Sequence, residues 1–206
     1  MRIGPAPSTE GAATLGVDPS FKRTGWALLA RDCRGKEALL AFGAVVPTGN
    51  SRAQGLLSTQ KAFQGVLAKC QPSWVVFEQP GKWMRRVGSS RRSVEVMAMA
   101  RGVMLAACAE LGVEAVEVDF QAVRRALLGR HNAGADSVLD FVRGLGVEPP
   151  RRPRGGVDMD VANAVLMAAY GLSLRGKAAC PAQDFPNGCP ATPGGSATPE
   201  SAGQPI

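Results

Sequence analysis

Two acidic side chains stand at the ends of apolar segments that have the composition of β-strands. Asp18 follows the segment TLGV and precedes the turn signal Pro19-Ser20, and Glu78 follows the unbroken apolar run Trp74–Phe77. A carboxylate at the end of a buried strand of an α/β sheet lies at the mouth of the crevice where such folds place their chemistry. An Asp before Pro is also a common turn residue, so Asp18 alone does not separate the two roles. The second strand-terminal acid favours the functional role.

A third group of acids begins the last predicted helix, over 158–172. Asp160 and Asn163 are spaced i,i+3 and share one helix face, whereas Asp158 has the position of an N-cap. We therefore expect Asp160, rather than Asp158, to join the two strand-terminal acids, with the Asn163 amide oxygen beside a metal or a water. Carboxylates placed side by side raise one another's pKa, and a hard divalent cation removes that cost. The predicted metal ligands are Asp18, Glu78 and Asp160, and Asn163 completes the predicted catalytic set.

Clustered carboxylates of this kind favour metal-dependent hydrolysis of a phosphodiester. Two Mg²⁺ ions about 4 Å apart activate a water and stabilise the leaving oxygen, and Mn²⁺ is able to substitute because it takes the same oxygen ligands. This chemistry needs no histidine, and the single histidine, His131, is expected in a loop. A single histidine excludes multi-histidine metal sites, and because His131 is expected in a loop we do not expect it to serve a Ser–His–Asp or Cys–His site. The five cysteines form no CxxC pair, so we expect no zinc site.

The chain carries a formal net charge of +7, and the excess positive charge is clustered. One cluster lies in the loop that follows Glu78, and a second lies at 151–154. Clustered positive charge is typical of proteins with a polyanionic partner, and Trp83 in the first cluster could stack on bases. The alternative is a solvated basic face with Trp83 folded back onto the domain. The predicted DNA contacts in this loop are Lys82, Trp83, Arg85, Arg86, Arg91 and Arg92.

The elements that must position these residues follow the order of an α/β domain. Three strands over 14–18, 24–30 and 37–46 are joined by short turns, which predicts an antiparallel meander. Two further strands are expected at 74–78 and 113–120. Helices are expected at 51–69, 93–111, 121–128, 135–145 and 158–172. Ser51 and Asp119 are expected to cap two of the helices, and Gly102 to bring its helix close to the sheet.

This order predicts an α/β fold with a mixed five-stranded sheet, the antiparallel meander plus parallel strands, flanked by helices. If the first and fourth strands are neighbours, Asp18 and Glu78 are adjacent. We expect a flexible leader at 1–12, one domain at 13–174 and a disordered Pro/Gly/Ala-rich tail at 175–206. The sequence shows neither a secretory signal nor a run of about 18 apolar residues, so we expect no membrane partner and a cytoplasmic location.

These segments together resemble the RuvC family of Holliday-junction resolvases, within the RNase H-like superfamily. GVDPSFKRTGWALL looks like the family's first motif, and VVFEQP resembles its Glu-Gln strand end. ARGVMLAAC is similar to its Ala-Arg-Gly helix, and FQAVRRALLGRHNAGAD to the stretch from a Gln-Val-Lys-type helix start to a small-residue turn. DVANAVLMAAY resembles the closing Asp-x-x-Asp-Ala helix. The resemblance runs in order from Thr14 to Leu172.

The resemblance implies an RNase H-like domain and a homodimer that binds a four-way DNA junction in recombination and repair. Each active site would nick one strand by Mg²⁺-dependent hydrolysis, so that the nicks are paired and leave 5′-phosphates. Asp18, Glu78 and Asp160 fall on the family's ligand positions. The cytoplasm would be that of a bacterium, or of the host cell of a virus.

The sequence departs from the family pattern at three places. Ser20 stands where the family usually has Gly, and Asn163 stands where cellular resolvases usually have a second Asp. The turn at 135–137 lacks the family's basic residue, and the candidates to replace it are Lys22, Arg124, Arg125 and Arg130. Two alternatives stay open: an RNase H-like nuclease on other branched or hybrid nucleic acids, and a weakly catalytic junction-binding protein, which the neutral Asn163 suggests.

Overall fold

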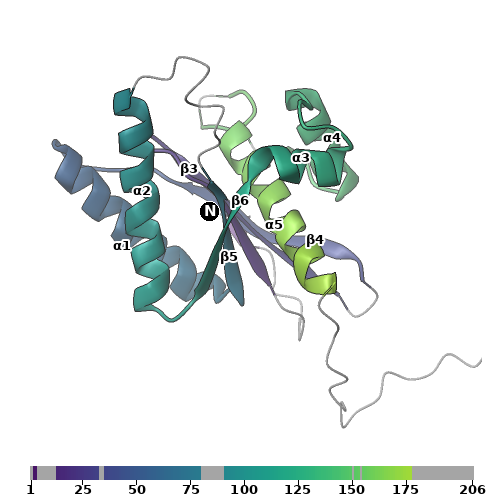
Figure 1. Ribbon diagram of the computed structural model, residues 1–206, viewed down its shortest axis with the longest axis horizontal. Helices are drawn as coiled ribbons and strands as arrows, with labels where there is room; N and C mark the ends of the chain where they lie inside the picture. The colour runs from purple at the N-terminus through teal and green to yellow at the C-terminus, as the bar shows by residue number, and fades with distance from the viewer. Residues whose placement is uncertain are drawn as a thin grey trace, which may run out of the picture.

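The computed structural model describes residues 2–3, 13–32, 35–79, 91–149, 151–153 and 155–177. They form one sheet with helices on both faces (Figure 1). The strands lie in the order β1-β4-β3-β2-β5-β6. The strands are β1 (Arg2–Ile3), β2 (Thr14–Asp18), β3 (Thr24–Arg31), β4 (Glu37–Val45), β5 (Trp74–Gln79) and β6 (Glu114–Asp119). The helices are α1 (Arg52–Cys70), α2 (Arg91–Glu110), α3 (Phe120–Leu128), α4 (Ala135–Gly144) and α5 (Met159–Lys177).

The predicted mixed sheet is confirmed. β2, β3 and β4 form the antiparallel meander, and β5 pairs in parallel with both β2 and β6. The strand that ends in Asp18 therefore lies inside the sheet, between β3 and β5. The sheet has one strand more than expected, because Arg2–Ile3 pairs with β4 at the edge. This strand falls in the segment expected to be a flexible leader, and two residues are too few for the alternation that identifies a strand in a sequence.

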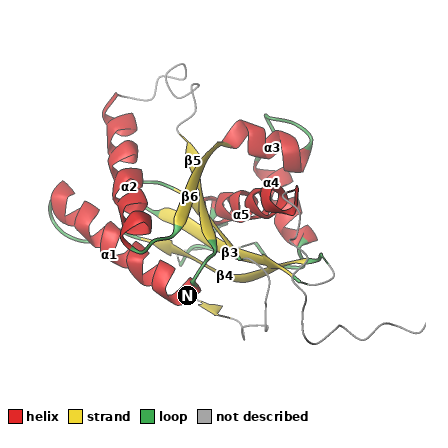
Figure 2. Ribbon diagram, turned by 60° about the horizontal axis from the view of Figure 1, so that its bottom comes forward, coloured by secondary structure: helices red, strands yellow, loops and turns green. Residues whose placement is uncertain are grey.

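The two faces of the sheet are covered by different helices (Figure 2). α1 and α2 bury Leu15 and Val17 of β2 on one face, and α3, α4 and α5 cover the other. Because side chains alternate between the faces of a strand, Gly16 and Asp18 face α5. The same alternation in β5 turns Glu78 toward α5. Both strand-terminal acids therefore open onto the face that carries the last helix.

α5 packs against the sheet where the strands carry no side chain. A Cβ atom on Gly16 of β2 would lie 2.1 Å from the carbonyl oxygen of Ala164, and one on Gly25 of β3 would lie 2.2 Å from the carbonyl of Asp160. No side chain fits at such distances, so these two glycines set the depth at which α5 meets the sheet. The close approach carries Asp160 and Asn163 to the strand ends.

The expectation that Gly102 brings α2 close to the sheet is wrong. Gly102 is exposed, and within the described part of the chain no atom lies within 4 Å of the position of its absent Cβ. α2 instead packs through its buried residues Ala100, Met104 and Ala107. The spacing of Gly102 within an apolar helix did not reveal which face of the helix it occupies.

The predicted caps are confirmed. The Ser51 hydroxyl accepts the Gln54 N–H at 3.2 Å while the Gln54 side chain accepts the Ser51 N–H, which forms a capping box. Asp119 accepts the Gln121 N–H at 3.0 Å and caps α3. After α2, Gly112 takes the left-handed conformation that commonly ends a helix, with φ of 66°.

The last helix continues past the expected domain boundary at 174. α5 runs to Lys177, and the Arg175 guanidinium lies 4.6 Å from the centre of the Trp74 ring and 2.5 Å from a carboxylate oxygen of Glu114. The rest of the predicted tail lies outside the described residues. In the described part of the chain, none of the helices combines the length and the apolar character needed to cross a membrane.

The glycine contacts with α5 make a prediction about stability. Gly16→Ala forces a methyl group into the Ala164 carbonyl and should destabilise the fold by about 3 kcal/mol, at the upper end of overpacking costs. Gly102→Ala is the matched control: it adds the same methyl group to an open helix surface and should stabilise α2 by about 1 kcal/mol. Urea unfolding of both variants measures the difference. Equal effects of the two substitutions would show that α5 does not depend on the missing side chain.

Candidate active site

Asp18 and Glu78 lie side by side at the carboxyl ends of β2 and β5. The parallel register pairs Val17 with Phe77, which places the next residue of each strand at the same edge. Burial raises the pKa of Asp18 well above its usual value, and repulsion by Glu78 raises it further. Burial also raises the pKa of Glu78. The sheet therefore holds two carboxyl groups that accommodate one shared proton more readily than two negative charges.

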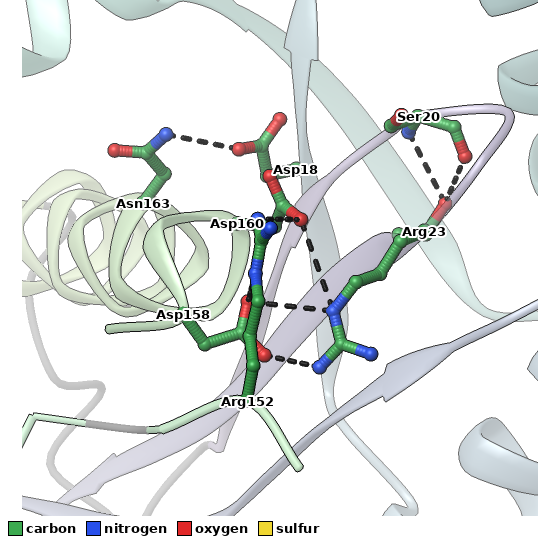
Figure 3. A network of polar contacts seen from close by, with 8 residues as sticks. Asp18, Ser20, Arg23, Arg152, Asp158, Asp160 and Asn163 are labelled. Atoms are coloured by element: carbon green, nitrogen blue, oxygen red, sulfur yellow. Dashed lines mark hydrogen bonds and ion pairs between the residues drawn. The ribbon is translucent and has the colours of Figure 1, made fainter. Parts of the chain in front are cut away.

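Asn163 joins this pair from α5. Its Nδ2 atom donates a hydrogen bond of 3.0 Å to Oδ2 of Asp18, as Figure 3 shows. Its Oδ1 atom is buried and has no hydrogen-bond partner among the residues that the structure describes. A buried amide oxygen without a partner is uncommon, because leaving it unsatisfied costs free energy. The amide therefore orients one carboxylate of the site and leaves a neutral oxygen ligand free.

Asp160 lies near the carboxyl pair but is held by arginines. Its Oδ2 atom lies 3.3 Å from Nη2 of Arg152 and 3.9 Å from Nε of Arg23 (Figure 3). The neighbouring Asp158 is buried and forms an ion pair with Arg23. Burial raises the pKa of Asp160, and the charge of Arg152 opposes that rise. The negative charge of Asp160 also adds to the rise in the pKa of Asp18.

The site contains a preformed acid pair rather than a preformed set of three acids. Among the described residues, no three His, Cys, Asp or Glu side chains are grouped closely enough to hold a metal ion. The carboxylate of Asp160 is instead paired with Arg152 and Arg23. Asp158 precedes the helix, and its carbonyl accepts the Ala162 N–H at 3.0 Å while its side chain pairs with Arg23.

The donors of the site suit a divalent cation. Asp18, Glu78, Asp160 and Asn163 offer only oxygen ligands, which Mg²⁺ and Mn²⁺ prefer. A divalent charge would lower the raised pKa values of the carboxyl groups, and the free Oδ1 atom of Asn163 could ligate the ion or a bound water. The residues therefore fit the metal that the chemistry of clustered acids requires.

Arg124, one of the predicted DNA contacts, acts electrostatically on the acid pair. Its charge lowers the pKa of Glu78, against the dominant effect of burial. The guanidinium lies 4.5 Å from the centre of the Phe120 ring, and its Nε atom is buried without a hydrogen-bond partner in the described part of the chain. Stacking on Phe120 holds the group in place while its Nε–H remains without a partner in the described part of the chain.

The other predicted DNA contacts either are exposed on the surface or have side chains that the structure does not describe. Lys22 is exposed in the turn between β2 and β3, and Arg125 and Arg130 are exposed on and after α3. His131 is exposed in a turn, as expected. Arg91 and Arg92 begin α2, but their side chains are not described. The predicted contacts outside the described residues are Lys82, Trp83, Arg85 and Arg86.

A groove with a cavity volume of about 700 Å³ lies beside the turn that follows Asp18. Lys22 and Arg52 contribute positive charge to its lining, and Phe21, Val96 and Met97 contribute apolar surface. Charged and apolar surface together suit the backbone and the bases of a nucleic-acid strand. The groove lies on the α1 and α2 side, and none of the four predicted catalytic residues is among its lining residues.

Two arginines of the site were not identified from the sequence as site residues. Arg23 carried no signal apart from its position in the turn after Asp18. Arg152 was noted only as one member of a basic cluster, because its spacing from Asp160 does not reveal the fold of the chain between them. That segment turns back on itself, so that the backbones of Arg151 and Val157 pair in an isolated antiparallel β-bridge.

Sequence comparisons with known proteins identify one family. The family model described as crossover junction endodeoxyribonuclease RuvC matches residues 14–168. The RuvC endonuclease of Anaeromyxobacter sp. (strain K) is 30% identical over 162 residues, which cover 78% of this chain and 80% of that protein. The corresponding protein of Anaeromyxobacter dehalogenans (strain 2CP-C) is 31% identical over the same shares of both chains.

Solved structures agree on the fold. The Thermus thermophilus RuvC structure superposes with a TM-score of 0.66 at 23% identity, covering 80% of this chain and 96% of that one. The structure of T. thermophilus RuvC in complex with Holliday junction substrate gives a TM-score of 0.66 at 22% identity, covering 81% and 96%. The yeast mitochondrial Holliday junction resolvase Ydc2 gives a TM-score of 0.62 at 11% identity, covering 84% and 82%.

The raised pKa of Asp18 makes a prediction about pH. A carboxyl group whose pKa is higher in the folded than in the unfolded protein costs stability as the pH rises above its unfolded value, about 4. Asp18→Asn removes that cost and should raise the melting temperature of the metal-free protein at pH 7 by a few degrees. The difference from wild type should widen as the pH increases from about 4, and Mg²⁺ should stabilise wild type more than the variant.

Asp140→Asn provides the control for this measurement. Asp140 is an aspartate of α4 whose side chain is 71% exposed. Its replacement should change the melting temperature little at any pH, because surface substitutions have small effects. An Asp18→Asn variant that is no more stable than wild type in EDTA at pH 7 would contradict the assigned repulsion between the acids.

Proposed function

The chain belongs to the RuvC family of crossover junction endodeoxyribonucleases, and we propose that it resolves four-way DNA junctions at a divalent-metal site formed by Asp18, Glu78 and Asp160. The observation that carries the proposal is the parallel register of β2 and β5, which brings two strand-terminal acids together on the face covered by α5. Asn163 supports it by bonding Asp18 from the helix.

The proposed site would hold Mg²⁺, with Mn²⁺ as a substitute, through the three carboxylates. Two such ions supply a nucleophilic water and stabilise the charge on the leaving oxygen. Asp18, Glu78 and Asp160 would hold the ions, and the Asn163 N–H orients the carboxylate of Asp18. Water attack on phosphorus with cleavage of the P–O3′ bond leaves a 5′-phosphate and a 3′-hydroxyl.

The basic residues would position the DNA. The charge of Arg124 acts on Glu78, so we assign Arg124 to the phosphate at the cut site, where its Nε–H would have a partner that it lacks in the described part of the chain. Lys22 and Arg52 in the groove would follow the backbone of the same strand. Two copies of the chain in a homodimer would present two sites and nick the junction in pairs, in the cytoplasm of a bacterium or of a virus-infected cell.

A junction-binding protein with weak catalysis is the second candidate, and Asn163 favours it. The neutral amide reduces the negative charge that the site offers to the metal ions by one, relative to an aspartate at this position. Reduced charge weakens metal binding and could leave the binding surface active without efficient hydrolysis. The two candidates differ in whether cleavage occurs at millimolar Mg²⁺.

An end-labelled four-way junction tests the proposal, with a linear duplex and an RNA–DNA hybrid as comparison substrates. Wild type should nick the junction in symmetric pairs in Mg²⁺ and not in EDTA. Asp18→Asn and Glu78→Gln should reduce the cleavage rate by at least about 1,000-fold while junction binding is kept, because the basic surfaces are untouched. Asp140→Asn is the control and should cleave at the wild-type rate. Cleavage retained by either active-site variant would refute the assignment of that residue as a metal ligand. Cleavage of the hybrid alone would refute the four-way junction as the substrate.

Arg124 and Arg125 give a matched pair for the DNA contacts. They are adjacent arginines of α3, but Arg124 is half-buried and affects Glu78, whereas Arg125 is exposed. Arg124→Gln should lower the cleavage rate of bound junction by about 100-fold, as the loss of a charge-stabilising donor does. Arg125→Gln should leave that rate unchanged and only reduce the salt dependence of binding. Single-turnover cleavage with saturating enzyme separates the effects, and equal rates for the two variants would show that Arg124 does not contact the reacting phosphate.

A further inference from the structure

We propose that Arg152 is a further catalytic residue of the proposed nuclease: it pairs with Asp160 in the metal-free protein and transfers to a DNA phosphate when Asp160 becomes a metal ligand. The inference rests on the proposed function, because it needs Asp160 to bind the metal. It concerns a residue whose role neither the motifs nor the comparisons assign. The contacts, exposure and backbone setting of Arg152 support it.

Four charged side chains form a neutral cluster at the start of α5. Arg23 and Arg152 face Asp158 and Asp160, and each arginine lies within 4.0 Å of both acids (Figure 3). The two positive charges balance the two negative charges. If Asp160 turns toward Asp18 and Glu78 to bind a metal ion, one arginine loses a partner.

The two arginines differ in how firmly they are held. Arg23 forms its main ion pair with Asp158, whose side chain is only 2% exposed, and its Nε atom lies 3.5 Å from the same carboxylate. Breaking such a buried pair is strongly destabilising. Arg152 is 48% exposed and reaches Asp160, which is 27% exposed, through one contact of 3.3 Å. Exposed pairs of this kind are weak, so Arg152 is the arginine that can exchange its partner.

The backbone holds Arg152 in place while its side chain remains free to turn. The Arg152 N–H donates to the Gly156 carbonyl, and the Gly155 N–H donates to the Arg152 carbonyl, both at 3.0 Å. Gly155 and Gly156 have φ values of 84° and 76°, which side chains rarely allow and which close the hairpin tightly. The hairpin therefore fixes the Cα atom of Arg152 beside the acids.

The exchange replaces one oxyanion by another. A phosphodiester that enters the site brings one negative charge, and the guanidinium fork matches a phosphate as well as it matches a carboxylate. Asp158 forms its main ion pair with Arg23 and lies 3.9 Å from Arg152, so the incoming phosphate is the partner that can replace Asp160 for Arg152. The same pairing means that Arg152 competes with the metal for Asp160 until DNA is bound.

Arg152 competes with the metal for Asp160 but also contacts the phosphate, so its removal should strengthen metal binding and slow cleavage. Arg152→Gln in the full chain should bind Mn²⁺ roughly threefold more tightly without DNA, because Asp160 loses a competing exposed ion pair. The same variant should cleave bound junction about 100-fold more slowly at saturating Mn²⁺, because a charge-stabilising donor is lost. Electron paramagnetic resonance of free Mn²⁺ measures the first quantity, and single-turnover cleavage measures the second.

Arg151→Gln is the matched control. Arg151 is the preceding residue of the same hairpin and is exposed, with the same charge. It should change neither quantity appreciably. Arg152→Lys keeps the charge without the fork, so it should bind Mn²⁺ as wild type does and recover only part of the cleavage rate. The same Arg152→Lys measurements decide the proposal if Arg152→Gln does not fold.

Two results would overturn the proposal. Weaker Mn²⁺ binding by Arg152→Gln would show that Arg152 supports the metal site instead of competing for Asp160. Unchanged cleavage would show that Arg152 does not contact the phosphate. Asp18→Asn separates this failure from that of the proposed function: if it binds Mn²⁺ as tightly as wild type, the metal site itself is assigned wrongly, whatever Arg152 does.

Discussion

The contact between α5 and the sheet is the constraint on which the site depends. Gly16 and Gly25 let the helix backbone approach the backbones of β2 and β3 at distances that no side chain permits. The strands supply two acids and the helix supplies Asp160 and Asn163, so the site exists only where these two layers meet. Van der Waals contact between main chains thus determines which polar side chains can reach one another.

Electrostatics then divides the site into two parts. Asp18 and Glu78 form an acid pair whose pKa values are raised by burial and, for Asp18, by mutual repulsion. Asp158 and Asp160 are instead balanced by Arg23 and Arg152 in a neutral cluster. Asp160 lies between the two parts, and its carboxylate is close enough to raise the pKa of Asp18. The arrangement stores unfavourable repulsion in the sheet and keeps the third acid available nearby.

The sequence was informative wherever a local pattern decides the structure. Periodicity identified the five long strands and the helices, and turn residues located their ends. The adjacency of Asp18 and Glu78 could be predicted only on the condition that the first and fourth strands are neighbours, and the pairing of β2 with β5 meets that condition. The ion pairs of Asp160 could not, because Arg23 and Arg152 reach it through tertiary contacts that no spacing encodes. Gly102 was misread for the same reason: its role depends on which helix face meets the sheet.

α5 also contacts the sheet far from the acids, where Gly171 lies against Thr14 and Val76 and where Arg175 stacks on Trp74. About 22 Å of helix separates Asp160 from Arg175, and each residue turns an α-helix by about 100°. Both ends of α5 are thus tied to one rotational phase. A single inserted or deleted residue within the helix would bring the wrong face to one end, whereas the loop before it has no such phase to keep. Length variation among descendants of this chain should accordingly be absent from α5 and accumulate between α4 and Asp158.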